Sequence, residues 1–198
     1  MSHLEPLSID FNSVELKPIF DQYAKALGFV PNSVLIMQRK PMIVKALAQL
    51  SAAVLGAESS TVELGFKRLI AHMASRASGC RYCIAHTAGS ALRLGIEPAK
   101  FEAIWEYSTS PLYSEAERVA LDFALAAAAV PNAVDDVLFS RMRSHWNDDQ
   151  IVEITGVISY FGFMNRWNDT MATPLEREPQ EVGEKYLSSH GWSAGRHV

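Results

Sequence analysis

A chain of 198 residues can form a domain with a sizeable core, and its 48% apolar and 20% charged residues are typical of soluble globular proteins. The net charge of -4 argues against a nucleic-acid partner, which favours a basic surface. No apolar run reaches the roughly 18 residues that span a bilayer, and the N-terminus lacks the pattern of a signal peptide. We therefore expect a cytoplasmic protein with no membrane partner.

The hydrophobic pattern has a helical period throughout, and the alternation typical of strands is missing. Proline, glycine and capping residues divide the chain into helices expected at residues 13–27, 33–39, 41–55, 60–78, 80–94, 98–107, 114–130, 134–146 and 147–164. This predicts an all-α fold of roughly eight to ten helices. We interpret residues 1–198 as a single domain, with a core over about 12–180 and a polar tail over 179–198 that frays or reaches a partner.

Two helix starts carry a capping box, in which a short polar side chain and a Glu or Gln three residues later cap each other's amides. The pairs are Ser60 with Glu63 and Ser114 with Glu117, and Asn147 with Gln150 gives the start signal of the last long helix. The helices over 117–130 and 151–164 are apolar on several sides, so we expect a homo-oligomer that covers them. A polar cluster ends the second of these helices and is explained by capping or a subunit contact: Asn165, Arg166, Asn168 and Asp169.

Both cysteines of the chain lie in the stretch "SRASGCRYCIAHTAG". Cys80, Cys83 and His86 are spaced by three residues, so a helix places them in one row on one face. Cys80 falls at the expected helix N-terminus, where free amides favour a thiolate. A neighbouring histidine can take up a thiol proton. These are the parts of a peroxide-reducing or thiol-exchanging centre, in which one cysteine becomes a sulfenic acid and the other resolves it.

Two other interpretations of these residues remain open. The cysteines can be ordinary core residues, or the C-x-x-C-x-x-H spacing can hold zinc with His72 of the preceding helix as a fourth ligand. A row along one continuous helix suits tetrahedral coordination poorly, and structural zinc usually serves domains without a large core. We therefore predict no metal site.

The stretch "SGCRYCIAHTAGSALRLGI" resembles the thiol motif of the AhpD-like family, the alkylhydroperoxidase and carboxymuconolactone decarboxylase superfamily. The segments "ALGFVPNSV" and "FMNRWNDTMATPLEREP" resemble the flanks of its peroxidase-related branch. The resemblance covers about residues 12–180. It implies an all-helical AhpD-like domain that assembles as a dimer, trimer or hexamer.

The resemblance also implies an activity: reduction of hydroperoxides, with electrons returned by an external dithiol carrier such as a lipoyl protein and no bound cofactor. Cys83 would attack, Cys80 would resolve, and His86 would match the family's histidine. Many members place that histidine one residue later, where this chain has Thr87.

The sequence departs from the family pattern upstream of the thiols. A relay glutamate is expected twelve residues before Cys80, and this position holds Arg68. His72, one turn later, is the nearest candidate to replace it, and its alternative is a buried, hydrogen-bonded histidine. Glu153 is a further candidate proton acceptor, although a first-turn glutamate is also stabilised by the helix dipole alone. Arg68 itself would lower a cysteine pKa or bind an anionic substrate.

Two functions therefore compete. The first is a peroxidase-like thiol oxidoreductase that uses Cys83 and Cys80. The second is a non-catalytic or weakly active assembly or binding protein of the same fold, in which Arg68 marks a degraded proton relay. Lactone decarboxylation is disfavoured because that branch of the superfamily usually lacks the C-x-x-C.

Overall fold

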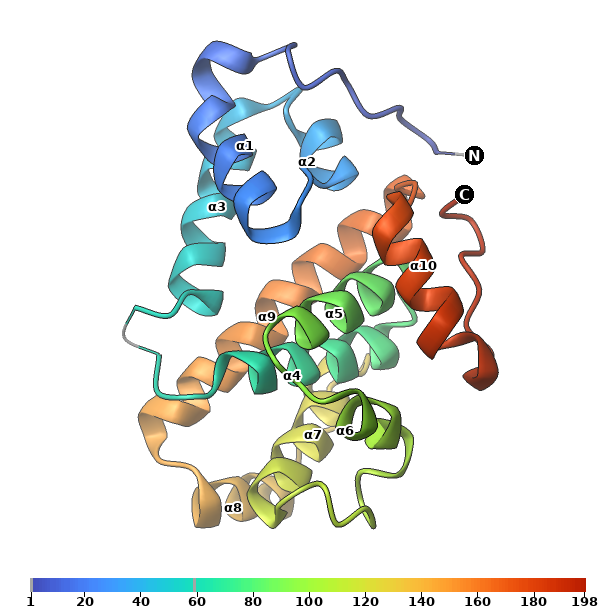
Figure 1. Ribbon diagram of the computed structural model, residues 1–198. Coiled ribbons are helices and arrows are strands. Elements are labelled where there is room, and N and C mark those ends of the chain that lie inside the picture. Colours follow the sequence, from blue (N-terminus) through green and yellow to red (C-terminus); the bar gives the residue numbers. More distant parts are fainter. Residues whose placement is uncertain (1, 59) are drawn as a thin grey trace.

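A computed structural model describes residues 2–58 and 60–198, and every regular element in these ranges is a helix (Figure 1). The elements are α1 (Ser13–Leu27), α2 (Asn32–Met37), α3 (Pro41–Leu55), α4 (Leu64–Ser78), α5 (Arg81–Arg93), α6 (Pro98–Glu102), η1 (Ala103–Glu106), α7 (Glu115–Ala128), α8 (Asp136–His145), α9 (Asp148–Met171), α10 (Arg177–Tyr186) and η2 (Ser188–His190). The predicted all-helical fold is confirmed, with ten α-helices in the described part of the chain.

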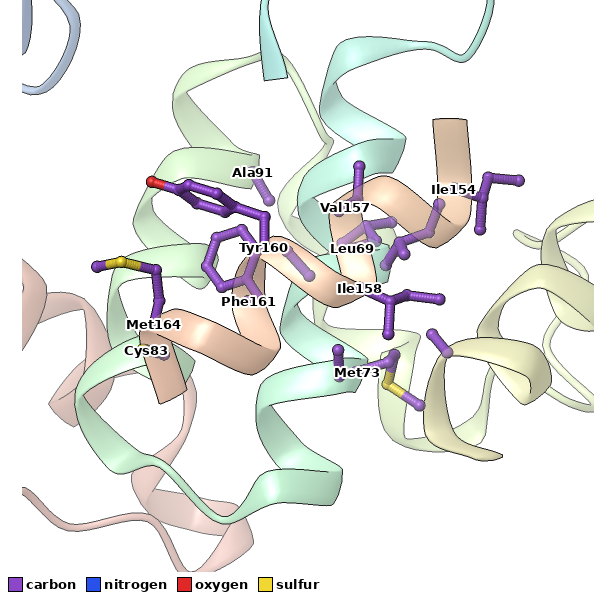
Figure 2. Close-up of a cluster of buried hydrophobic side chains, with 14 of the residues drawn as sticks. Leu69, Met73, Cys83, Ala91, Ile154, Val157, Ile158, Tyr160, Phe161 and Met164 are labelled. Atoms are coloured by element: carbon purple, nitrogen blue, oxygen red, sulfur yellow. The ribbon is translucent and has the colours of Figure 1, made fainter. Parts of the chain in front are cut away.

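Helix α4 lies at the centre of the fold and packs against α5, α7 and α9. In Figure 1, α1, α2 and α3 lie above α4, α5 and α9, whereas α6, α7 and α8 lie below them, and α10 runs beside α5. Apolar side chains of α4 and α9 meet in the core, among them Leu69, Met73, Ile154, Val157 and Ile158 (Figure 2). The two cysteines belong to the same core.

The apolar side chains of α4 from Phe66 to Met73 are buried, whereas Ala77 near its end is exposed. Gly79 ends the helix with φ at 73°, a left-handed conformation that glycine adopts without steric cost. The chain can therefore turn sharply and begin α5 two residues later, with Cys80 as the residue that caps it.

One of the two predicted capping boxes is present, and the other is wrong. The Ser114 pair forms as expected at the start of α7, and the predicted start signal at Asn147 and Gln150 also forms a capping box, at the start of α9. Helix α4 begins only at Leu64, because Glu63 is itself the capping residue and accepts hydrogen bonds from the amides of Gly65 and Phe66.

Helix α9 is longer than its apolar pattern predicts and continues to Met171. It is central, as expected, but Val152 and Phe163 are 71% and 44% exposed, so its apolar surface is not fully covered. The expected homo-oligomer therefore stays a prediction. In residues 2–58 and 60–198, no helix combines the length and apolar character that crossing a membrane requires.

The C-terminal tail packs on its own chain, which corrects the expectation that it frays, whereas the alternative that it reaches a partner stays a prediction. Helix α10 lies against α5, and Leu187 after it is fully buried. The indole of Trp192 packs on Gly183 and donates a hydrogen bond of 3.1 Å to the carbonyl of Arg81. Because Arg81 is the first residue of α5, the tail supports the helix that carries both cysteines.

Candidate active site

The start of α5 brings the two thiols together. The sulfur of Cys80 accepts a hydrogen bond from the amide of Cys83 at 3.5 Å, the interaction of an N-terminal capping residue. Both cysteines are free and buried, with exposed fractions of 0% and 2%. The C-x-x-C pair therefore lies at a helix N-terminus, as predicted.

Cys83 is held as a neutral thiol in the resting protein. Burial raises its pKa well above the usual value, and a hydrogen bond with Cys80 raises it further. The side-chain amide of Asn168 on α9, 3.5 Å from the Cys83 sulfur, opposes this effect by donating toward it. Cys83 therefore needs a base before it can act as a nucleophile.

His86 lies one turn after Cys83 and is joined to a carboxylate. Its Nε2 is 2.6 Å from Oε2 of Glu176, which precedes α10. Burial alone would raise the pKa of Glu176, but the charge and hydrogen bond of His86 and the amide of Asn32 hold it below its usual value. Glu176 is thus ionised and can only accept, so Nε2 of His86 carries the shared proton. In the neutral imidazole Nδ1 is then unprotonated and can take up a second proton, which gives the imidazolium whose charge acts on Glu176.

Three groups fix Glu176 in position. Its Oε1 accepts hydrogen bonds from the hydroxyl of Tyr82 at 2.8 Å and from the amide of Asn32 at 2.5 Å, and its Oε2 faces His86. The ring of Tyr82 also stacks on the imidazole of His86, with centroids 4.2 Å apart. The carboxylate, imidazole and phenol form one buried network beside the thiols.

A pocket of about 150 Å³ opens beside Cys83. Its walls come from α1, α2, α3, α4, α5 and α9, and its surface is mainly apolar, although more than half of the lining residues carry a polar group. Figure 2 shows Met164, Phe161 and Tyr160 of α9 near Cys83, and all four residues line the pocket. His86 and Asn168 line it as well, whereas Cys80 does not. Cys83 is therefore the cysteine that a small molecule would meet.

Arg68 also lines the pocket, but it does not act on the thiols as expected. It is absent from the groups that shift the pKa of Cys83, which is raised and not lowered. Burial lowers the pKa of Arg68 itself, and the nearby hydroxyl of Tyr160 counteracts this. Arg68 therefore belongs to the candidate site as a residue that lines the pocket.

His72 is fully buried beneath α5, and its position does not support a relay role. Its Nδ1 lies 3.1 Å from the hydroxyl of Thr87 and 3.2 Å from the carbonyl of Ile84, and its ring meets Phe101 edge-on. Burial, together with the charge of Arg76, lowers its pKa to about 3. His72 is therefore neutral at physiological pH, and it does not line the pocket.

Glu153 lies away from the thiols, in a separate structural pair. It forms an ion pair with Lys67, whose side chain is 2% exposed, and accepts hydrogen bonds from Ser60 and Thr61. Burial would raise its pKa, but these hydrogen bonds outweigh burial and hold the pKa at about 2. The proton-acceptor role considered for Glu153 is not supported, since it does not line the pocket of Cys83.

Sequence reasoning missed Glu176, Asn168 and Tyr82 as site residues. Tyr82 stands between the two cysteines and Asn168 belongs to the polar cluster that ends the buried helix, so both were visible but had simpler explanations. Glu176 lies 90 residues from its partner His86. The available signal for it was a carboxylate inside the segment "ATPLEREP", which resembles a family flank.

No group of three or more His, Cys, Asp and Glu side chains is arranged to hold a metal ion within residues 2–58 and 60–198. Among the ligands considered for zinc, His86 is turned to Glu176, and Nδ1 of His72 is turned to Thr87 and Ile84. What the arrangement offers instead is two adjacent thiols, one facing a pocket that a carboxylate-bound histidine also lines.

Comparison with known proteins places these residues in a family context. A model of the carboxymuconolactone decarboxylase family matches residues 41–126, which include both cysteines and His86. An uncharacterised protein of Escherichia coli K12, YnjA, is 31% identical over 97 residues, which are 49% of this chain and 53% of YnjA. The chain thus spans about half the length of this curated relative.

Solved structures agree over a larger part of the chain. The debrominase Bmp8, in a cysteine-to-alanine variant bound to 2,3,4-tribromopyrrole, superposes with a TM-score of 0.85 at 31% identity, covering 92% of this chain and 96% of Bmp8. An uncharacterised peroxidase-related protein from Ralstonia eutropha JMP134, described as an alkylhydroperoxidase AhpD core, has a TM-score of 0.78 at 20% identity, covering 90% and 94%. The second comparison supports the fold alone.

Proposed function

The chain belongs to the AhpD-like superfamily, which includes the carboxymuconolactone decarboxylase family, and we propose that it is a thiol oxidoreductase that reduces small hydroperoxides through Cys83 and Cys80. The observation that carries this proposal is the pairing of a pocket-facing thiol with a second thiol and a carboxylate-bound histidine. Cys83 attacks because it lines the pocket, and Cys80 resolves because it is adjacent and lies outside it.

In the first step, Nδ1 of His86 takes the proton of the Cys83 thiol, directly or through a water. The thiolate attacks the terminal peroxide oxygen, so that an S–O bond forms and the O–O bond breaks. The leaving alkoxide takes the proton from His86, which gives an alcohol and a sulfenic acid on Cys83. Glu176 stabilises the imidazolium that forms transiently, and the Asn168 amide stabilises the thiolate.

In the second step, the thiol of Cys80 attacks the sulfenic sulfur of Cys83. An S–S bond forms, the S–O bond breaks, and water leaves with the proton supplied by Cys80. An external dithiol, such as a lipoyl group, then reduces the disulfide by exchange. The pocket opening gives such a reductant a route to the Cys83 sulfur.

Glu176 also bears on the alternative of a degraded relay. That alternative rested on Arg68, which replaces the carboxylate expected on the helix before the thiols. A carboxylate reaches His86 from the C-terminal segment instead, held by three hydrogen bonds. A complete base therefore accompanies the thiols, which supports an active enzyme.

A second candidate function is reductive removal of a halogen, favoured by the likeness to Bmp8 over nearly the whole chain. Here the Cys83 thiolate would attack the bromine of a bromoarene, so that an S–Br bond forms, the C–Br bond breaks, and the carbon takes a proton. Cys80 would then displace bromide and form the same disulfide. Both reactions consume two electrons from the thiol pair and differ only in the atom attacked.

The test measures turnover with dihydrolipoamide as the reductant. Purified protein is given either cumene hydroperoxide or 2,3,4-tribromopyrrole, and peroxide consumption and bromide release are followed in parallel. We expect peroxide consumption that Cys83→Ser abolishes and that requires the dithiol. Bromide release without peroxide consumption would establish the second candidate, and neither reaction above the Cys83→Ser background would refute both.

A further inference from the structure

Arg68 is a cation without a partner in an otherwise neutral pocket. It makes no hydrogen bond and no ion pair within residues 2–58 and 60–198. By contrast, Arg93, the last residue of α5, pairs with Glu178 at 2.5 Å. None of the described residues that line the pocket is an aspartate or glutamate, so nothing in its wall neutralises the guanidinium.

The hydroxyl of Tyr23 is a second unsatisfied group at the same pocket. This oxygen is buried and has no hydrogen-bond partner. Tyr23 comes from α1 and lines the pocket together with Arg68 of α4, and the hydroxyl of Tyr160 lies near enough to both to affect their pKa values. An unpaired guanidinium and an unpaired hydroxyl are the donors that a carboxylate requires.

Burial makes the missing partner costly. An arginine keeps its charge at any physiological pH, and loss of solvent around that charge is unfavourable unless a counter-charge is present. Arg68 is half-buried, and this partial burial lowers its pKa. An anion bound in the pocket would offset this cost.

Arg68 and Cys83 line one pocket from different helices. Arg68 belongs to α4 and Cys83 to α5, so an anion on the guanidinium and a reactive group at the thiol can occupy the same pocket. A volume of about 150 Å³ matches cavities that hold one benzene-sized group. Apolar walls complete the site, formed by Leu27, Val34, Leu55, Phe161 and Met164.

We propose that the pocket selects a small aromatic or compact apolar acid, whose carboxylate is bound by Arg68 and Tyr23 while its electrophilic atom faces Cys83. The placement of the electrophilic atom at Cys83 rests on the proposed thiol chemistry, and that atom can be either a peroxide oxygen or a halogen. Arg68, which replaces the expected relay glutamate, thus becomes a specificity-determining residue. Its planar guanidinium suits two parallel hydrogen bonds to a carboxylate.

Binding is tested without turnover, in the Cys83→Ser protein, by titration calorimetry with benzoate and with its neutral analogue benzamide. We expect benzoate to bind at least about 10-fold more tightly than benzamide, since charge-assisted hydrogen bonds are worth that much or more. Adding the Arg68→Gln substitution should weaken the affinity for benzoate by about 10- to 100-fold and leave the affinity for benzamide unchanged. Arg143→Gln, an exposed arginine outside the pocket, is the matched control.

Equal affinity for benzoate and benzamide, or no measurable binding of benzoate, would overturn the proposal. So would an Arg68→Gln protein that binds benzoate as tightly as its parent. If Arg68→Gln does not fold, the same titration is made with Arg68→Lys. We expect its affinity for benzoate to lie below that of the parent, since a point charge replaces only part of the guanidinium's interaction.

The chemistry is tested separately, by the rate at which Cys83 of the otherwise unaltered protein reacts with cumene hydroperoxide and with its para-carboxylate. A faster reaction of the carboxylate that Arg68→Gln removes supports the inference. Failure of both peroxides to react would count against the peroxidase proposal, and the benzoate titration would still decide whether the pocket binds an acid.

Discussion

Replacing Glu176 with glutamine removes a negative charge from the site but keeps the size of the side chain. In the native protein Oε1 accepts from Tyr82 and from the amide of Asn32, and Oε2 faces Nε2 of His86. A glutamine can keep the first two bonds through its carbonyl oxygen. Its NH₂ group then faces His86, so the imidazole must turn Nε2 into an acceptor and move its proton to Nδ1.

This tautomer removes the base from the thiol, because Nδ1 now carries a proton and has no lone pair to accept another. The imidazolium would also lack its carboxylate. General-base catalysis contributes about 10²- to 10⁴-fold, so we expect Glu176→Gln to slow the reaction of Cys83 by about 100-fold or more. The cost in stability should be about 1.5–3 kcal/mol, the value of one hydrogen bond to a charged group.

The assay is the second-order rate of Cys83 with iodoacetamide and with cumene hydroperoxide at pH 7, in a Cys80→Ser background so that only one thiol reacts. Glu178→Gln is the matched control, since Glu178 is the next carboxylate along the chain but pairs with the half-exposed Arg93. A Glu176→Gln protein that folds and reacts within about threefold of its parent would refute the role given to the His86–Glu176 pair.

The remaining predictions concern stability. Glu153→Gln should cost about 3 kcal/mol, because the buried ammonium of Lys67 loses its counter-charge, as urea unfolding would show. Because the pKa of Glu153 is lowered, its carboxylate contributes fully to the free energy of unfolding above pH 4.5, and this contribution is lost as the pH falls toward 2. An acid-unfolding curve that is the same for Glu153→Gln and the native protein would contradict this. Gly183→Ala should lower stability by about 1–3 kcal/mol and expose the C-terminus to proteolysis, because a Cβ there overlaps Trp192. Gly162→Ala, which meets no atom within 4 Å, should be neutral or stabilising, and equal proteolysis of the two variants would oppose this reasoning.

Local rules predicted most of the helices and the position of the thiols. The capping boxes at Ser114 and Asn147 form because both partners lie within one turn of chain. The start of α5 at Cys80 follows from Gly79, which ends α4, and from the spacing of the two cysteines. These interactions depend on sequence neighbours alone, so the sequence contains the information for them.

Predictions failed where distant segments compete for a group. Ser60 does not cap α4 because its hydroxyl is bonded to Glu153, 93 residues away. The polar tail was expected to be loose because its few anchors, Leu187 and Trp192, are isolated in the sequence. Glu176 could not be assigned to His86 since no periodic pattern links residues 90 apart. The site therefore differs from the expected one mainly in where its carboxylate comes from.

The central claim, a two-electron dithiol centre in which Cys83 attacks and Cys80 resolves, is tested most directly by intact-protein mass spectrometry after one equivalent of cumene hydroperoxide. The account predicts an intramolecular disulfide in the native protein and a sulfenic acid on Cys83, trapped by dimedone, in Cys80→Ser. Cys83→Ser should show neither product. Thiols that stay reduced in the native protein, or a sulfenic acid that forms on Cys80 in Cys83→Ser at the native rate, would contradict it.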